Sequence, residues 1–499
     1  MVMECRITEA SNREATFHGT SVEFYVLTIV RESTSDTEGL STMAATREDI
    51  HVDLELFAKL NSEIARLFSK EDIESLAKET GWSQRTSKLA SHLFLVVFVF
   101  GMNIYKIPTL EQLIGLLHIC VPDLIITRQA MHDRINTYAA ALFQHMLSRA
   151  IQISIPYEFD LSLLKSFSRV IILDSTAFQL PKDLADIFPG SGGSASIAGM
   201  KIQFGYDIKS SQFFYLVQEG NVPDNSDKSD YLAFLNQGDL IIADLGYFTI
   251  SRLKETHHKN AYYLMRLKLN TTIYIKNDQG NYSEIDLLEL SDGIANNIEE
   301  REIYLKESNV FIQIRLVLER VPAQVIEQRI RRINANDKKK GKSTSEKTKA
   351  LQAFNLYISN APISMLEGKH FRKLYCIRWQ VELIFKNWKS NFGLDEFTGI
   401  REERIRCMVY AKLLMIFLLT RLSCWIRNIV WLEKKRELSE FRFTKHVIVK
   451  ANEWLRLIIL EPENVTKFIT NIIRFAVRHC LKIKQNGRVY PLEMLEGLA

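Results

Sequence analysis

Two short apolar runs, each leading into an aspartate, constrain the fold of this chain more than any other feature. Residues 170–173 read Val-Ile-Ile-Leu before Asp174, and residues 240–243 read Leu-Ile-Ile-Ala before Asp244. Continuous apolar runs of this kind are typical of strands that are buried on both faces of a sheet. A carboxylate at the end of such a strand is costly unless it is solvated or paired, so it usually lies at the rim of the sheet beside a ligand cleft.

The residues around these runs predict the other elements of a mixed sheet with helices on its faces. A hairpin is expected over 199–209 and 212–218, where two strand-like stretches flank a short polar turn. Helices are expected at 227–237 and 249–257, and a further strand at 261–268. The fold class is therefore predicted to be α/β.

Residues 374–389 predict one amphipathic helix with a polar edge. At about 100° per residue, four side chains fall within an arc of about 60°: Tyr375, Arg378, Glu382 and Lys389. Taken alone, such an edge is usually a solvated face with an Arg378–Glu382 ion pair. The two aspartates favour a functional site, because Glu382 would supply a third carboxylate.

Three carboxylates in one place suit a hard divalent cation, because Mg²⁺ prefers oxygen ligands. Two such ions about 3.5–4 Å apart can hold the attacking and leaving oxygens of a phosphoryl displacement. Arg378 and Lys389 would then face phosphates, and Tyr375 would bind a phosphate or stack on a sugar or base. The pattern predicts phosphodiester cleavage or transfer on nucleic acid.

Residues 270–360 differ in character and predict a separate β-rich unit. Strands are expected at 271–275, 301–305, 310–318 and 354–358. Between the last two lie the basic stretch 329–332 and a Lys/Gly/Ser-rich segment at 337–345, which is expected to be a flexible exposed loop. This loop is either a solvated connector or a direct DNA contact.

Composition permits a nucleic-acid partner without requiring one. The chain has 499 residues and a formal net charge of +5, so it is mildly basic and long enough for two to four domains. Six scattered cysteines without a CxxC pair favour a reducing cytoplasm. The longest apolar run, 93–102, is too short to cross a bilayer, which takes about 20 residues, so we expect no membrane association.

Residues 51–150 and the tail after 432 are predicted to be mainly helical. Thr109 and Thr127 each stand in capping position before a helical pattern. The second of these helices is either a helix-turn-helix recognition helix or one half of an ordinary helical hairpin. Its candidate DNA-reading side chains are Arg128, Gln129, His132 and Arg134.

Several of these motifs together resemble the DDE transposases of the insertion-sequence-four family. They are Asp-Ser-Thr at 174–176, Ala-Asp-Leu-Gly-Tyr-Phe at 243–248, and the spacing Tyr375-x2-Arg378-x3-Glu382-x6-Lys389, which matches the family's Y-R-E-K signature. Residues 199–207 are also family-like. The resemblance is good over about 160–430 and looser over 75–150. It implies a ribonuclease-H-like mixed-sheet catalytic core with a β-rich insertion, flanked by helical N- and C-terminal domains.

The resemblance also implies roles for individual residues. Asp174, Asp244 and Glu382 are expected to bind two Mg²⁺ ions, for which Mn²⁺ would substitute. Metal-activated water would cut one strand at the transposon end, and the freed 3′-OH would attack the opposite strand and finally target DNA. The residues expected to grip DNA are Tyr375, Arg378, Lys389 and Arg266.

The implied protein is a cut-and-paste transposase that acts as a homodimer on paired inverted-repeat ends in a bacterial or archaeal cytoplasm, associated with the nucleoid. Characterised relatives stack a flipped base on a tryptophan of the insertion, whereas this chain has no Trp between 83 and 378. A Tyr or Phe of the insertion would take that role, or the hairpin step would differ. The alternatives are a related ribonuclease-H-like nuclease or resolvase, and an inactive DNA-binding repressor.

The expected domain organisation has five parts. An N-terminal DNA-binding domain precedes a catalytic core that is interrupted by the insertion, and the C-terminal region is a candidate for dimerisation. The predicted boundaries are 1–160, 161–269, 270–360, 361–432 and 433–499.

Overall fold

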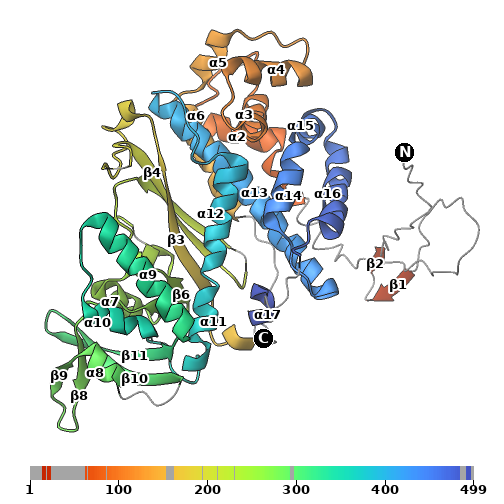
Figure 1. Ribbon diagram of the computed structural model, residues 1–499. Helices are drawn as coiled ribbons and strands as arrows, with labels where there is room; N and C mark the ends of the chain where they lie inside the picture. The colour runs from red at the N-terminus through yellow and green to blue at the C-terminus, as the bar shows by residue number, and fades with distance from the viewer. Residues whose placement is uncertain are drawn as a thin grey trace, which may run out of the picture.

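The structure is a computed structural model in which a large sheet lies beside a helical layer (Figure 1). It describes residues 14–17, 20–23, 62–64, 66–85, 87–152, 162–193, 195–210, 212–229, 231–292, 297–483 and 490–495. Most of the first 61 residues of the predicted N-terminal domain therefore lie outside the described residues. A short hairpin of β1 (Glu14–Phe17) and β2 (Thr20–Glu23) is the described part of that stretch.

Five strands form the central part of the sheet, in the order β5-β4-β3-β6-β7. Their bounds are β3 Val170–Gln179, β4 Gly199–Asp207, β5 Phe213–Glu219, β6 Leu240–Ala243 and β7 Tyr262–Arg266. β3, β4 and β5 pair antiparallel, whereas β3, β6 and β7 pair parallel. The predicted hairpin and mixed sheet are confirmed, as is the helix before β7, which is α7 (Ile250–His258).

Two predictions in this region are wrong. β3 does not end at Asp174 but continues to Gln179, because β4 keeps pairing with it after β6 has ended at Ala243. The predicted helix at 227–237 is only a 3₁₀ turn, η3 (Tyr231–Phe234). The Ser229 hydroxyl donates to the carbonyl oxygen of Pro223 at 2.9 Å, and a local side chain–backbone bond of this kind competes with helix formation.

The expected β-rich unit is present, but it is not separate from the core. Its strands continue the central sheet in the order β7-β12-β11-β10-β8-β9, which gives this sheet ten strands among the described residues. β12 pairs antiparallel with β7, with Tyr357 opposite Arg266. One apolar cluster includes side chains from both parts of the sheet, such as Ile241 and Leu316. The bounds are β8 Ile273–Lys276, β9 Tyr282–Ile285, β10 Ile298–Glu307, β11 Val310–Arg320 and β12 Phe354–Ser359.

Helix α9 (Ala323–Lys340) connects β11 towards β12 and takes up much of the predicted loop at 337–345. None of the residues of α9 is buried, and the helix ends at Gly341, whose φ of 60° is left-handed. The Asp337 carboxylate then accepts from the Thr344 backbone N–H at 2.8 Å. The first four residues of the predicted loop are therefore a helix end, whereas 341–345 form a mostly exposed loop that is tied to that helix end. The other helices here are α8 Leu287–Asp292, α10 Glu346–Ala350 and η5 Leu351–Ala353.

The predicted helix at 374–389 has a tightened turn that divides it into α11 (Phe371–Cys376) and α12 (Trp379–Phe392). The backbone N–H of Ile377 bonds to Leu374, and that of Arg378 bonds to Tyr375, three residues back in each case. A 3₁₀ turn advances by about 120° per residue, since it has three residues per turn. The simple helical spacing of the four polar side chains therefore does not hold across the turn.

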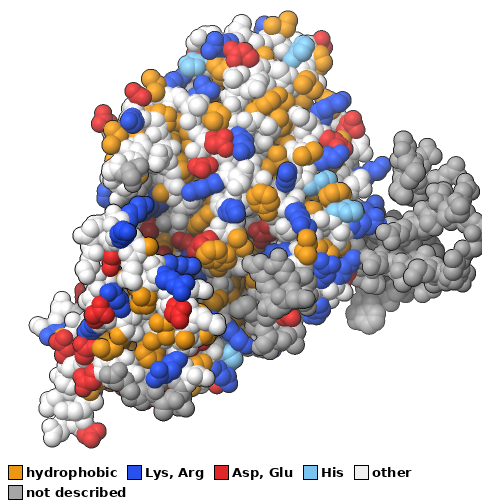
Figure 2. Space-filling model, viewed as in Figure 1, with side chains coloured by type: hydrophobic (Ala, Val, Ile, Leu, Met, Phe, Trp, Pro, Cys, Tyr) orange, Lys and Arg blue, Asp and Glu red, His pale blue; other side chains and the backbone are white. Residues whose placement is uncertain are grey.

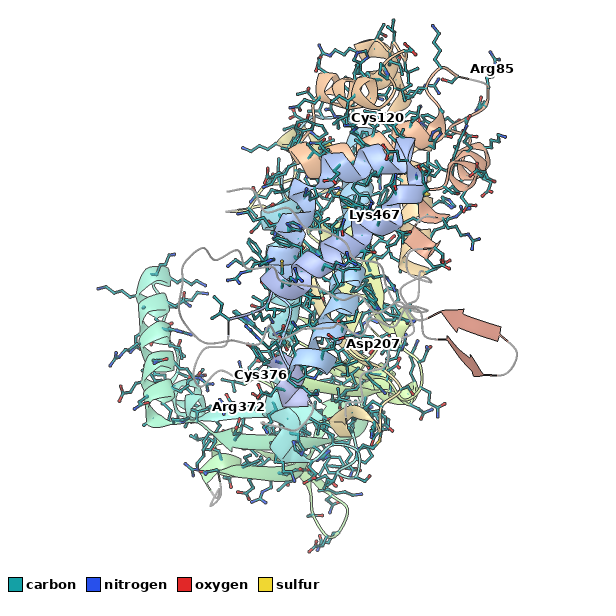
Figure 3. All side chains as sticks on the ribbon, turned by 90° about the vertical axis from the view of Figure 1, so that its right-hand side faces the viewer. Arg85, Cys120, Asp207, Arg372, Cys376 and Lys467 are labelled. Atoms are coloured by element: carbon teal, nitrogen blue, oxygen red, sulfur yellow. The ribbon has the colours of Figure 1, made fainter. Side chains whose placement is uncertain are left out.

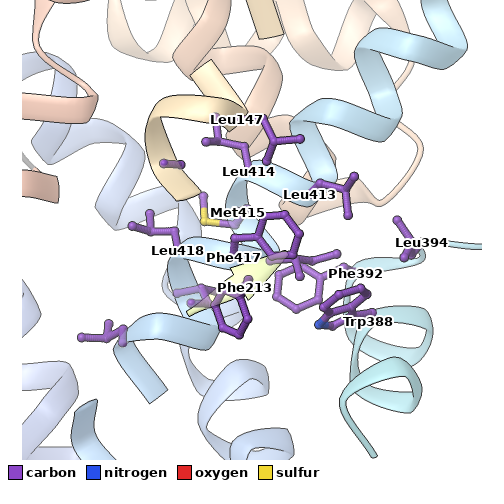
Figure 4. Close-up of a cluster of buried hydrophobic side chains, with 14 of the residues drawn as sticks. Leu147, Phe213, Trp388, Phe392, Leu394, Leu413, Leu414, Met415, Phe417 and Leu418 are labelled. Carbon is purple, nitrogen blue, oxygen red and sulfur yellow. The ribbon is translucent and has the colours of Figure 1, made fainter. Parts of the chain in front are cut away.

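Helix α12 docks on the sheet through a cluster of aromatic side chains (Figure 4). Trp388 is fully buried, with its ring 4.8 Å from Phe204 of β4 and 5.7 Å from Phe417. Gly393, with a φ of 59°, ends the helix. This packing fixes α12 across β3 and β4 and thereby fixes the polar side chains of its first turn.

The long apolar helix α13 (Glu402–Lys434) is the centre of the helical layer. Among the described helices it is long and apolar enough to cross a membrane, but its apolar stretch is wholly buried within the protein, as in the core helix of a globular fold. N-terminal and C-terminal helices both pack into its hydrophobic cluster. The N-terminal ones are α2 Lys70–Glu79, α3 Ser91–Tyr105, α4 Leu110–Cys120, α5 Arg128–Arg134 and α6 Thr137–Gln152. The C-terminal ones are α14 Glu440–Val449, α15 Ala451–Leu460, α16 Val465–His479 and α17 Pro491–Leu495.

Short 3₁₀ turns complete the described secondary structure. Their bounds are η1 Ser162–Leu164, η2 Lys182–Leu184, η4 Leu245–Tyr247, η6 Gly368–His370 and η7 Pro462–Asn464. Of these, η4 directly follows β6 and has Asp244 as its capping residue.

Candidate active site

Asp174 and Asp244 occupy equivalent positions on two neighbouring parallel strands. In the register of β3 and β6, Leu173 lies opposite Ala243, and each aspartate is the next residue of its strand or of the turn that follows it. Val170 and Ile172 pack into the cluster that contains α12, and side chains alternate in direction along a strand. The alternation directs the Asp174 side chain to the α12 face of the sheet.

Glu382 reaches the same place from the first turn of α12, and Arg378 connects it to Asp174. The Arg378 guanidinium donates from Nη1 to Asp174 Oδ2 at 2.9 Å and from Nη2 to Glu382 Oε1 at 2.6 Å. Both are charge-assisted bonds between partly buried groups, which are stronger than bonds between neutral groups. A strand carboxylate and a helix carboxylate therefore share one cation.

The electrostatics of Asp174 place all three carboxylates near one another. The pKa of Asp174 is raised to about 6, chiefly by burial and also by the negative charges of Asp244 and Glu382. The Ser175 backbone N–H, which bonds to Asp174 Oδ1 at 2.8 Å, and the Arg378 charge act in the opposite direction. Ionising this carboxyl beside two others is unfavourable unless a cation is present.

The three residues fit a divalent cation in their chemistry. All supply carboxylate oxygens, which hard cations prefer, and a cationic group already lies between two of them. Asp244 has one oxygen engaged, because its Oδ1 accepts from the Gly246 N–H at 2.7 Å. Within the described ranges, no three acidic, His or Cys side chains are already drawn together as metal ligands. The Arg378 guanidinium bonds to two of the three carboxylates, those of Asp174 and Glu382.

The other predicted DNA-binding residues lie around this cluster. The Tyr375 ring lies 5.3 Å from Tyr357, and the Arg378 guanidinium lies 5.9 Å from the centre of the Tyr375 ring. Lys389 extends along α12 and donates from Nζ to the Ala177 carbonyl oxygen at 3.1 Å. Arg266 is the last residue of β7 and lies opposite Tyr357 in the β7–β12 register.

A groove of about 840 Å³ runs from Arg378 and Tyr375 past the end of β7. Figure 2 shows acidic side chains in a hollow between α9 and α12, with Lys and Arg side chains on the surface around it. Further residues that line the groove were not predicted as site residues: Arg329, Asn355, Arg372, Trp379, Arg442 and Lys482. These come from five segments of the chain, so no local spacing groups them. Trp379 is 54% exposed, whereas a tryptophan in an amphipathic helix is expected to be buried. The sequence alone does not reveal this exposure.

The candidate recognition helix α5 is not part of this site. It lies with α4 at the opposite end of the molecule from the β insertion (Figure 1). Its polar side chains bond within the protein, since Arg128 pairs with Glu111 at 3.1 Å and Gln129 donates to Asp133 at 2.7 Å. His132 lies 2.7 Å from Arg401, and Arg134 donates to Ser87. These contacts favour an ordinary helical hairpin over a helix-turn-helix recognition helix.

A mixed sheet with aspartates on two neighbouring strands and a glutamate on an adjacent helix, beside a basic groove, is the arrangement expected of an enzyme that acts on phosphodiesters. Comparison with known proteins narrows this class. The family model described as "Transposase DDE domain" matches residues 165–418. The chain belongs to the DDE transposase family, and the predictions of a ribonuclease-H-like α/β core and of a transposase that acts on DNA are confirmed.

The curated relatives are transposases of insertion sequence elements, and they are similar over most of their length. The transposase for insertion sequence element IS231F of Bacillus thuringiensis subsp. israelensis is 32% identical over 446 residues, which are 85% of this chain and 91% of the relative. That for IS231E of Bacillus thuringiensis subsp. finitimus is 32% identical over 461 residues, 88% and 93% of the two chains. That for IS1151 of Clostridium perfringens is 28% identical over 459 residues, 88% and 96%.

Proposed function

We propose that this transposase moves its element by a cut-and-paste route, using a site made of Asp174, Asp244 and Glu382. The observation that carries the proposal is that one cation, Arg378, joins two of these residues beside the strand that carries the third. Arg378 bonds to Asp174 and Glu382, and Asp244 lies on the neighbouring strand at the equivalent position. This is the residue set expected of a site that holds two Mg²⁺ or Mn²⁺ ions.

Bound divalent cations would supply an activated water and would stabilise the charge that develops on the phosphate. The protein residues around them bind and orient the DNA. Lys389 presents a point charge to the backbone of the strand, and Tyr375 offers a hydroxyl donor. Once a phosphate draws the Arg378 guanidinium away, its paired donors can bind two phosphate oxygens and leave the carboxylates free.

Trp379 is the candidate for stacking on an unpaired base. The insertion holds no tryptophan, but Trp379 lines the groove, follows Arg378 directly and is half exposed. Stacking of a base on an aromatic ring contributes about 1–3 kcal/mol and does not depend strongly on the base. We therefore assign this role to α12 in place of a Tyr or Phe of the insertion.

The substrate that we propose is double-stranded DNA with inverted repeats at the two ends of the element, held by a homodimer in the cytoplasm near the nucleoid. The test uses purified protein, Mg²⁺ and a labelled duplex carrying one end. Asp174→Asn, Asp244→Asn and Glu382→Gln should each abolish cleavage, whereas Asp183→Asn, which changes an exposed acid on η2, should not. Full cleavage by any of the three variants would contradict the assignment.

The same assay separates a transposase from a nuclease or a repressor. A transposase should join the freed 3′-OH to a second DNA molecule, and a nuclease or resolvase should cut without joining to unrelated DNA. An inactive repressor should bind the duplex and leave it intact. Metal dependence is measured by repeating the reaction with EDTA and with Mn²⁺.

A further inference from the structure

Three arginines from separate segments meet in the part of the groove that lies beyond Tyr375. Arg266 comes from β7, Arg329 from α9 and Arg372 from α11, and all three line the same cavity. Figure 3 shows Arg372 close to Cys376 on α11, beside the sheet. We refer to Arg266, Arg329 and Arg372 as the arginine cluster.

The arginine cluster has more positive charge than its acidic neighbours neutralise. Arg372 pairs with Glu319 at 3.2 Å, and the other oxygen of Glu319 accepts from Asn355 at 2.9 Å. Arg329 is held by neutral acceptors, with bonds to the carbonyl oxygens of Gln352 at 3.0 Å and Phe354 at 3.2 Å. Arg266 has no hydrogen bond or ion pair in the part of the chain that the structure describes. Three cations therefore share one ion-paired carboxylate.

The excess charge affects the arginines themselves. Burial lowers the pKa of Arg329, and the positive charges of Arg266 and Arg372 lower it further. Like charges repel most strongly where the surroundings exclude water, so a cluster of this kind is stabilised by an anion. A planar guanidinium can bind two oxygens of a phosphate at once, which a lysine cannot do.

A short chain of contacts connects the arginine cluster to the catalytic carboxylates. The Arg378 guanidinium lies 5.9 Å from the centre of the Tyr375 ring, and that ring lies 5.3 Å from Tyr357. Tyr357 in turn lies opposite Arg266 in the β7–β12 register. A strand that places one phosphate beside Arg378, next to the carboxylates, can therefore place a later phosphate at the arginines within the same groove.

We propose that the arginine cluster is a second phosphate-binding subsite, which holds the DNA strand that continues past the cleaved bond. The proposal rests on the function proposed above and adds Arg329 and Arg372 to its DNA contacts. Glu319 sets the strength of the subsite, because it pairs with Arg372 in the protein without DNA.

The test measures DNA binding without metal, so that it does not depend on cleavage. A labelled duplex with one end of the element and flanking DNA is titrated in EDTA, and its fluorescence anisotropy is followed at several salt concentrations. Arg372→Gln should weaken binding about tenfold and reduce the slope of log affinity against log salt by about one. Glu319→Gln should tighten DNA binding and steepen the slope, because it removes the negative charge that pairs with Arg372. The glutamine can still accept the hydrogen bond from Asn355.

The matched control is Arg331→Gln, which removes an exposed arginine from the same helix as Arg329. It pairs with Glu327 and does not line the groove. If Arg372→Gln and Glu319→Gln both bind as this control does, the subsite is wrong. Thermal melting checks that the variants fold. If Arg372→Gln does not fold, the binding of Glu319→Gln decides the outcome.

Failure of the subsite and failure of the proposed function give different results. If wild-type protein cuts DNA and Asp174→Asn does not, while the Arg372 and Glu319 variants bind normally, only the subsite is overturned. If wild-type protein binds DNA with the expected charge dependence but never cuts it, the arginine cluster stands as a phosphate site and the catalytic proposal fails.

Discussion

Arg378 bonds at once to two of the carboxylates that we propose as metal ligands, Asp174 and Glu382. Without that cation, Asp174 and Glu382 would face each other and Asp244 across a partly buried space, which raises the cost of keeping them all ionised. A divalent cation needs the same oxygens, so the guanidinium competes with it. A DNA phosphate that attracts the guanidinium would remove this competition, and DNA binding would then favour metal binding.

Removing the guanidinium should therefore strengthen metal binding in the absence of DNA. We expect Arg378→Ala to bind Mn²⁺ several-fold more tightly than wild type in a calorimetric titration, because its carboxylates have lost the competing cation. Lys389→Ala is the matched control, since Lys389 bonds to the Ala177 carbonyl and not to a carboxylate. If Arg378→Ala bound Mn²⁺ as wild type does or more weakly, the guanidinium would not compete with the metal for the carboxylates.

Lys412, a buried lysine away from the proposed metal ligands, should make the stability of the protein depend on pH. It is 1% exposed, and its ammonium donates to the carbonyl oxygens of Gly393 and Glu396 just after α12. Burial lowers the pKa of Lys412 to about 8 from a usual value of 10.5. Between these two pH values the unfolded chain binds more protons than the folded protein, so the contribution of Lys412 to stability rises with pH.

The expected difference is measurable by urea denaturation across that range. The free energy of unfolding of wild type, relative to Lys412→Met, should be flat below about pH 8 and should rise towards pH 10.5, by at most about 3 kcal/mol. Methionine has a similar volume and does not titrate, so the comparison isolates the charge. A constant difference across the range would show that Lys412 keeps its usual pKa.

At the scale of elements, α12 packs on the sheet through Trp388 in its C-terminal half and presents Trp379 and Glu382 from its first turn. Trp388 belongs to the aromatic cluster under the helix, whereas Trp379 lies at the start of the helix and faces the groove. The two tryptophans therefore separate packing from binding within one helix.

Substitutions at these two positions should affect different properties. Trp388→Ala should lower the free energy of unfolding by about 3–5 kcal/mol, because it leaves a large cavity in the core. Trp379→Ala should change stability by less than about 0.5 kcal/mol, as exposed positions usually do, and should weaken binding to DNA with unpaired bases. Urea denaturation and anisotropy titrations measure the two effects. Equal losses of stability would contradict the described packing.

At the scale of the whole molecule, the N-terminal and C-terminal helices share one core. The ring of Phe100 in α3 lies 5.5 Å from that of Trp454 in α15, edge to face, and both pack with α13. The predicted boundaries at 160 and 433 divide the sequence, but the two regions are in contact through these side chains.

A shared core predicts that damage to one region destabilises the other. We expect Trp454→Ala to speed amide hydrogen exchange in α3 as well as in α15, because both helices lose the same packing contact. Exposed Leu460→Ala, on α15 but outside the core, is the control. Wild-type exchange in α3 would indicate two independent domains.

Local patterns in the sequence predict the elements near Asp174 and Asp244, because buried strands need continuous apolar residues. They do not predict the contact between Arg378 and Asp174, which are 204 positions apart. Spacing along 374–389 favours an Arg378–Glu382 pair, which the structure contains. The same spacing carries no information about which strand lies next to the helix, so it cannot predict the contact with Asp174. The arginine cluster could not be predicted for the same reason, since β7, α9 and α11 are brought together only by the sheet.

The position of β12 between β7 and β11 has a mechanical consequence. A continuous hydrogen-bonded ladder joins the insertion to the strands that carry the aspartates, so the insertion cannot swing on a hinge towards a bound duplex. Force applied at α9 is therefore transmitted through this ladder to the strands that carry the aspartates, with little bending of the sheet. The DNA must therefore supply the bending that brings its end into the groove, and bending a short site through a large angle costs about 1–6 kcal/mol. We expect flexible steps next to the cut to lower that cost, so that the binding of the proposed ends would depend on the deformability of the flanking sequence.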